Sequence, residues 1–371
     1  MRLLDRYLLR ELLTPLAMCL GGFLIFWVSF DLFNQLAVLQ EHKLHGDEIV
    51  LYEILRTPEM LAVVLPVALL LALLYALTQH ARHNEITAMR AAGISLWRLA
   101  APYLGVGFAA SVALFVVNEF VAPLGSTAAQ KIFNRHMEVK VVAANASEPL
   151  VFNNARGGRV WGMDFYDEQK HVMRNVHVNW KQPDGSQLVL SAGAGWFSNR
   201  VWNFTNVQQH AIMPGNIFPV NRQFTNLLTK PEFTETPDQI NGQLKIRRLS
   251  AKAHVEQAQI PLRDLFDYLR LNSELAGKER RWVLTQFHSR LASPWTCLVV
   301  VFLAIPFGAA SGRRNVFVGV AGSIFICFAF FVLQQLGLAF GTGGQLWPWL
   351  GAWFPNLFFV AAGVVLASRV R

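Results

Sequence analysis

The stretch Met60-Leu-Ala-Val-Val-Leu-Pro-Val-Ala-Leu-Leu-Leu-Ala-Leu-Leu-Tyr-Ala-Leu77 decides the fold class of this chain. It holds no charged side chain, and a helix needs about 20 predominantly apolar residues to cross the hydrocarbon core of a bilayer. The rest of the chain agrees, since 53% of its 371 residues are hydrophobic and only 15% are charged. Soluble domains are nearer a quarter charged. The sequence therefore predicts an α-helical membrane protein.

Other apolar segments extend the pattern along the chain. We predict six transmembrane helices, at residues 13–33, 60–77, 99–122, 291–307, 316–340 and 347–367. The first follows Arg2, Arg6 and Arg10, as a signal peptide would. Its apolar run is too long for that role and no convincing small-residue cleavage site follows it, so we expect a retained helix.

The short connections give the orientation. One side of the six-helix chain carries an excess of arginine, which marks it as cytoplasmic. The opposite connection at 341–346 has no charge. Both termini are therefore expected in the cytoplasm, and the long insertion after the third helix is expected outside. The net charge of +9 fits this membrane orientation without a nucleic-acid partner. The arginines that set it are Arg2, Arg6, Arg10, Arg82, Arg90, Arg98, Arg313, Arg314, Arg369 and Arg371.

That insertion, residues 125–290, changes the hydrophobic period. Alternating segments at 159–166, 171–180, 187–191 and 200–207 are separated by turn signals at 154–158, 183–185 and 198–199. Short alternating strands at this spacing favour an all-β sandwich or barrel. Helices are expected on its flanks, at 126–140 and 261–271. The predicted organisation is thus helices 1–3 in 1–124, the extracytoplasmic β-rich domain in 125–290, and helices 4–6 in 291–371.

The connection between the second and third helices, residues 79–95, carries the clearest local signal. Asn84 can cap a short helix, Glu85 then lies in its favourable first turn, and Gly93 can end it. Such a helix, at about 84–93, would lie across the cytoplasmic face with a carboxylate and small side chains. It can dock into a groove of a soluble partner, or it can be a connector without a partner. The small side chains are those of Ala88, Ala91 and Ala92.

This segment resembles the coupling-helix region of the LptF/LptG permeases of the lipopolysaccharide-export ABC transporter. The family pattern Glu-Ile/Leu-x-x-Met-x-Ala-x-Gly is matched here by Glu85, Ile86, Met89, Ala91 and Gly93. Further similarity lies at the opening Leu-Asp-Arg-Tyr-Leu, at Asn-Glu-Phe-Val-Ala-Pro ending the third helix, and at Ala-Ile-Pro-Phe-Gly in the fourth. The ordered set covers nearly the whole chain.

The resemblance implies a permease rather than an enzyme. Two such permeases would pair, bind a dimeric LptB-like ATPase that holds the ATP and Mg, and extract lipopolysaccharide from a Gram-negative inner membrane. The β insertion would be a jelly-roll-like periplasmic domain that passes lipid to a bridge and to membrane-anchored Lpt partners. This chain would itself bind no cofactor and no metal. The expected ATPase contacts are Glu85, Ile86, Met89, Arg90, Ala91 and Gly93.

A lipid path is suggested by three kinds of side chain. An aromatic stripe on the first helix can face acyl chains, at an entrance that the resemblance places at helices 1 and 5, or can be ordinary lipid-facing packing. Glutamines in the fifth helix need polar partners in lipid. An outer arginine can bind phosphate bidentately or be solvated. The predicted path residues are Phe26, Phe30, Phe33, Arg56, Gln334 and Gln335.

This chain departs from the family pattern at one place, and other functions stay open as alternatives. LptG-type permeases carry lysines near the outer end of the first helix, and residues 31–38 have none. The opening and the end of the third helix nevertheless favour the LptG type. A membrane-anchored binding or scaffold protein, a permease for another lipid or a lipoprotein, and a secondary transporter are the alternatives. Copurification with an ATPase would separate the exporter from the scaffold.

Overall fold

The computed structural model of the chain describes residues 3–41, 44–135, 150–167, 170–182, 185–214, 220–250, 260–272, 275, 277–309 and 316–369. The chain forms two compact units. The helical unit comprises Met1–His136, Gln257–Pro261 and Arg281–Arg371, and the β unit comprises Met137–Glu256 and Leu262–Arg280.

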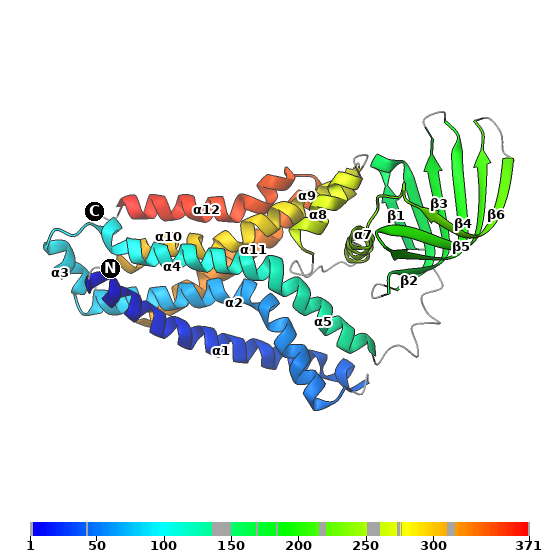
Figure 1. Cartoon of the computed structure of the whole chain (residues 1–371). Coiled ribbons are helices and arrows are strands. Elements are labelled where there is room, and N and C mark those ends of the chain that lie inside the picture. The colour runs from blue at the N-terminus through cyan, green and yellow to red at the C-terminus, as the bar shows by residue number, and fades with distance from the viewer. Residues whose placement is uncertain are drawn as a thin grey trace. The chain divides into compact units, whose positions relative to one another are not determined.

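Long helices build the helical unit (Figure 1). Within the described part of the chain, six helical segments are long and apolar enough to cross a membrane, as the sequence predicts. The elements are α1 (Leu3–Glu41), α2 (Gly46–Arg82), α3 (Glu85–Ala91), α4 (Leu96–Val116), a π-helical turn (Val117–Val121), α5 (Ala122–Arg135), α9 (Gly277–Ala292), a 3-10 turn (Ser293–Trp295), α10 (Thr296–Ala309), α11 (Val316–Gly343) and α12 (Pro348–Arg369). Of these, α9 belongs to this unit from Arg281 onward.

Several boundaries differ from the sequence-based prediction. The second helix begins at Gly46 instead of residue 60, because its polar first turns hide it from a search for apolar runs. Its start is fixed by a capping box in which the His45 N–H donates to Glu48 Oε2 at 3.1 Å. The fourth span begins in α9 and continues through the 3-10 turn into α10. The predicted helix at 126–140 is present in α5 up to Arg135, and its remainder lies outside the described residues.

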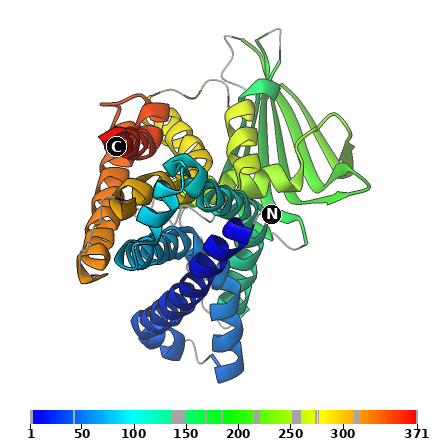
Figure 2. The same ribbon diagram turned by 90° about the vertical axis from the view of Figure 1, so that its left-hand side faces the viewer.

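The core of the helical unit joins α1, α2, α4 and α10. Its fully buried members include Leu12, Leu69, Leu73, Tyr103 and Val301. α1 begins and α12 ends at the end of this unit where α3 lies (Figures 1 and 2). Glycine permits a close crossing of α11 and α12, because a Cβ on Gly337 of α11 would collide with the Gly351 carbonyl oxygen of α12.

A six-stranded antiparallel sheet dominates the β unit. Its strands follow one another in the order β1-β2-β3-β4-β5-β6. They are β1 (Leu150–Asn154), β2 (Arg159–Asp167), β3 (Val172–Lys181), β4 (Gln187–Ser198), β5 (Val201–Ile212) and β6 (Val220–Lys230). The four predicted strands correspond to β2 to β5, so a β-rich domain inserted between three helices and three helices is confirmed. The turns at 154–158 and 198–199 are also present, whereas Pro183 and Asp184 lie outside the described residues.

One face of the sheet packs against a helix that the sequence did not predict. Trp161, Trp202 and Phe204 of the sheet are fully buried with Ile240 and Leu244 of α7 (Pro237–Ser250). α8 (Leu262–Leu271) packs beside α7 and matches the predicted amphipathic helix. The core of this unit is therefore closed by α7, whose mixed composition gives a weak amphipathic signal.

Candidate functional site

α3 is a short helix set off from its neighbours by two left-handed residues. Asn84 before it has φ 57°, and Gly93 after it has φ 82°. The prediction that Gly93 ends the helix is confirmed, and the absence of a Cβ makes this conformation accessible. Asn84 occupies the N-cap position, as predicted, but its backbone is left-handed and its side chain makes no cap hydrogen bond.

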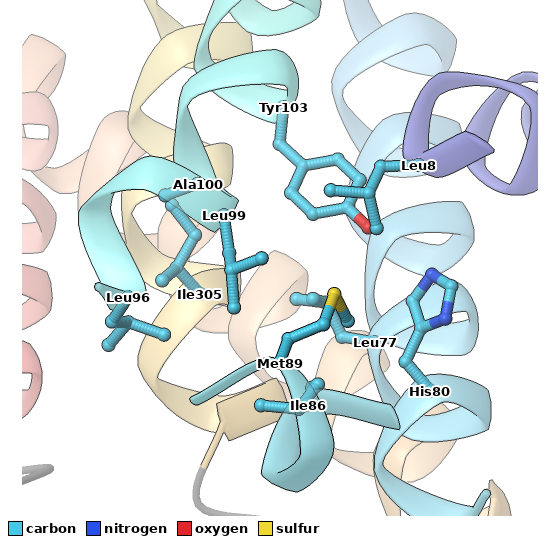
Figure 3. A pocket seen from close by; sticks show the side chains of 10 residues that line it. All are labelled: Leu8, Leu77, His80, Ile86, Met89, Leu96, Leu99, Ala100, Tyr103 and Ile305. Atoms are coloured by element: carbon cyan, nitrogen blue, oxygen red, sulfur yellow. The ribbon is translucent and has the colours of Figure 1, made fainter. Parts of the chain in front are cut away.

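The inner face of α3 packs on the helical unit. Ile86 is buried and Met89 is half-buried. Figure 3 shows both side chains among those that line a pocket between α3 and the long helices. Leu77, Leu99 and Ile305 line the same pocket, whose volume is about 20 Å³. Ile86 and Met89 thus attach α3 to its own chain.

Glu85 ties the start of α3 to two long helices. Its Oε2 accepts a hydrogen bond from the Tyr7 hydroxyl at 3.0 Å and lies 2.7 Å from His80 Nδ1. Burial alone would raise the pKa of this carboxyl, but the hydrogen bonds from His80 and Tyr7 and the nearby His83 outweigh it. The pKa of Glu85 is therefore held below its ordinary value. The carboxylate links α3 to α1 through Tyr7 and to α2 through His80.

Two polar groups at the pocket lack a protein partner. His80 Nε2 and the Tyr103 hydroxyl are buried without a hydrogen bond among the described residues. Buried polar groups normally have one. The cavity of about 20 Å³ is large enough for one water, for which about 10–15 Å³ suffices.

The outer face of α3 is open. Thr87, Ala88, Arg90 and Ala91 are exposed, as is Gly93 beyond the helix. Small side chains leave a shallow surface with one cation, Arg90, at the C-terminal end. A partner helix or groove can therefore approach the backbone of α3 closely.

A second interaction, an ion pair, holds the first turn of α1 near α3. Asp5 pairs with Arg98 at the start of α4, at 2.8 Å. Tyr7 and Asp5 together bind α1 to α3 and to the start of α4. Sequence reasoning missed both residues, because their partners lie 78 and 93 positions away.

At the opposite end of α1, Arg56 is already occupied by its own chain. Its guanidinium lies 2.7 Å from Asp31 Oδ2 and 3.3 Å from the Tyr52 hydroxyl. Gln35 accepts from Tyr52 at 2.9 Å and donates to Asp31 at 2.7 Å. This polar cluster joins α1 to α2, and only Arg56 was predicted as a functional residue.

The remaining path residues occupy two helices. Phe26, Phe30 and Phe33 are 64%, 55% and 78% exposed on α1, so this stripe faces outward from the described unit. Gln334 is half-buried and Gln335 exposed on α11, which packs against α2 and α12. Arg56 is thus bound to α1 through Asp31. Gln334 and Gln335 lie on α11, which also contacts α2.

A comparison with known families bears directly on this arrangement. A family model described as "Lipopolysaccharide export system permease LptF/LptG" matches residues 6–369. The chain belongs to this family. Curated relatives include the protein named "Lipopolysaccharide export system permease protein LptF" in Escherichia coli (strain K12) and its namesake in Shigella flexneri. Each is 22% identical over 378 residues, which cover 97% of this chain and 93% of the relative.

Membership in the LptF/LptG family, with the six spans, makes this a multi-pass inner-membrane protein among the permeases of lipopolysaccharide export. The motif-based family prediction is confirmed. The narrower prediction of an LptG-type chain stays a prediction. Among the described residues, no group of three or more His, Cys, Asp or Glu side chains is placed to hold a metal ion.

Proposed function

We propose that this chain is one permease of an ATP-driven exporter, and that α3 receives the force of ATP hydrolysis from a separate LptB-like ATPase dimer. The observation that carries the proposal is the two-sided construction of α3. Its outer face offers small side chains and Arg90, while Glu85, Ile86 and Met89 fasten its inner face to the long helices. A displaced α3 would therefore move α1 and α2 with it.

In this account the two ends of α1 act together. Movement of α3 reaches the start of α1 through Tyr7. The other end of α1 is bound to α2 by the Asp31–Arg56 ion pair. A lipid phosphate that competes for Arg56 would loosen this pair and free α1 beside the exposed phenylalanine stripe. Gln334 and Gln335 would present hydrogen-bonding groups on the facing helix of the entrance.

The remaining parts of the proposal concern the side of the membrane on which each segment lies and the partner proteins. α3 and both termini lie in the cytoplasm, as the arginine distribution indicates. The β unit then lies in the periplasm and passes lipopolysaccharide to a bridge and membrane-anchored Lpt partners. A second permease of the same family completes the membrane part. ATP and Mg are held by the ATPase, and this chain contributes positioning and movement.

Copurification tests the central contact. Ala91→Trp adds bulk to the open face of α3, and Ala361→Trp adds the same bulk to an exposed position on α12. We expect an ATPase and a second permease to copurify from the native membrane with the unmodified chain and with Ala361→Trp. Ala91→Trp should lose the ATPase. Equal recovery with both variants would remove α3 as the docking element, and recovery of the chain alone would favour the scaffold function.

Glu85 has a different expected effect. Because its carboxylate points toward Tyr7 and His80, Glu85→Ala should retain the ATPase and lose lipid transport. Loss of the ATPase in this variant would instead place Glu85 in the docking surface.

A further inference from the structure

The β unit contains a polar cleft away from its aromatic core. The cleft has a volume of about 360 Å³, within the range of small-molecule sites. Four segments supply its walls: the turn after β1, the segment after β6, and helices α7 and α8. Its polar side chains are Asn154, Arg156, Thr234, Gln239, Asp267 and Arg270. We propose that this cleft binds a phosphate-bearing sugar.

Two arginines supply the anion-binding part. Arg156 comes from the turn after β1 and Arg270 from α8, and both are exposed. Within the part of the chain that the structure describes, neither forms an ion pair, although Asp267 lies only one helical turn from Arg270. Guanidinium groups bind phosphate through paired, parallel hydrogen bonds. Two unpaired guanidiniums on one cleft are therefore suited to a phosphate that enters it.

Buried hydrogen bonds hold the turn that carries Arg156 in place. Asn154 is buried, and its Oδ1 accepts from the Gly157 N–H at 2.9 Å. Its Nδ2 donates to Glu235 Oε1 at 2.8 Å, and the same oxygen accepts from Arg159 Nε at 2.6 Å. Trp202 Nε1 also donates to the Glu235 carbonyl oxygen, at 2.7 Å. A floor held in this way loses little conformational freedom when a ligand binds.

The other side chains select for hydroxyl groups. The Gln239 side-chain oxygen accepts from the Thr236 N–H at 3.1 Å, which leaves its amide hydrogens to donate. Asp267 is acceptor-only when ionised, so it can receive a hydroxyl hydrogen. A carboxylate beside two arginines weakens binding of a bare anion and favours a ligand with both a phosphate and hydroxyls. A phosphorylated monosaccharide has this chemistry.

The inference that the cleft binds a phosphate-bearing sugar does not depend on the proposed function. Only the source of that sugar rests on the proposed function. If the chain carries lipopolysaccharide, the phosphorylated sugars of that lipid are the natural occupants. The cleft would then bind the headgroup of the lipid, and the acyl chains would lie elsewhere.

Titration calorimetry on the purified full chain tests the site. The detergent must lack sugar and phosphate, for which lauryldimethylamine oxide is suitable. The probes are glucosamine 6-phosphate, glucosamine and inorganic phosphate. We expect the sugar phosphate to bind at least roughly tenfold more tightly than either of the other two, a difference of about 1.4 kcal/mol. Comparable binding of inorganic phosphate would reduce the cleft to a simple anion site, and no heat with any probe would overturn the proposal.

Variants locate the binding. Arg156→Gln and Arg270→Gln should each weaken sugar-phosphate binding by roughly tenfold or more. Arg263→Gln, an exposed arginine on α8 outside the cleft, is the matched control and should leave it unchanged. Asp267→Asn should tighten inorganic phosphate. Unaltered affinity in both cleft variants would overturn the assignment.

A final comparison separates this inference from the proposed function. Both cleft variants should still copurify with the ATPase, because the cleft lies in the β unit. Purified lipopolysaccharide should compete with the sugar phosphate if the lipid is its source. Absence of competition, with probe binding intact, would assign the site to a free sugar phosphate. A failed ATPase copurification of the unmodified chain would count against the export function and leave the calorimetry valid.

Discussion

The hydrogen bond between Tyr7 and Glu85 can be isolated with a double-mutant cycle. Tyr7→Phe removes the hydroxyl and keeps the ring, which lies 5.7 Å from the His80 ring between centroids. Glu85→Gln removes the charge and keeps the shape of the side chain. The double variant then shows how much of each effect depends on the other.

The structure sets the expected size. A hydrogen bond to a charged group contributes about 1.5–3 kcal/mol when sheltered. Tyr7 is 40% exposed and the Glu85 side chain is 32% exposed, so solvent screens part of it. We therefore expect a coupling energy of about 1 kcal/mol between the two substitutions.

Reversible unfolding in mixed detergent micelles measures the four free energies of unfolding. The coupling should also depend on pH. Because the folded-state pKa of Glu85 lies below its ordinary 4.5, the carboxylate stabilises the folded chain above pH 4.5. This contribution is lost as the pH falls through the folded-state pKa. Additive effects at neutral pH, within a few tenths of a kcal/mol, would refute the link between α1 and α3.

Three further outcomes are expected from unfolding measurements. Arg56→Gln leaves Asp31 largely buried without its cation and should lower the free energy of unfolding by about 3 kcal/mol. Asp31→Asn together with Arg56→Gln should recover part of that free energy. Equal losses in the single and the double variant would show that the pair is not coupled. Burial raises the pKa of Asp264 from 3.8 to about 6, so the folded chain binds the extra proton and should lose stability as the pH rises between these values. Asp264→Asn should flatten that slope and stabilise the chain at neutral pH, and an unchanged slope would contradict the assignment. Glu235→Gln weakens the buried contact with Arg159 at 2.6 Å and should cost about 2–4 kcal/mol, seen as a lower unfolding midpoint.

Hydrophobic pattern alone was sufficient for most of the architecture. The apolar lengths predicted six spans, and the two-residue alternation predicted β2 to β5, because both signals are local. β6 was missed because most of its side chains are exposed and do not alternate. β1 has only five residues. α7 was missed because its apolar face is narrow and its burial depends on a sheet formed from distant sequence.

The candidate site divides in the same way. The segment of α3 was recognisable because Glu85 to Gly93 form a contiguous motif. The groups that hold α3, Tyr7 and His80, carry no local signal of that role. The cleft in the β unit was not predictable, because Arg156 and Arg270 come together only through the packing of α7 and α8 on the sheet. Contacts between distant segments were the part that sequence reasoning could not supply.

The central claim is that ATP hydrolysis by a partner drives lipid extraction through this permease. The most direct test places the complex copurified from native membranes into liposomes that contain lipopolysaccharide, and follows its transfer to a soluble periplasmic acceptor. We predict transfer that requires ATP, stops with a non-hydrolysable analogue, and is lost with Glu85→Ala although the ATPase remains bound. Hydrolysis of ATP by the intact complex with no transfer, or equal transfer with and without ATP, would contradict the account.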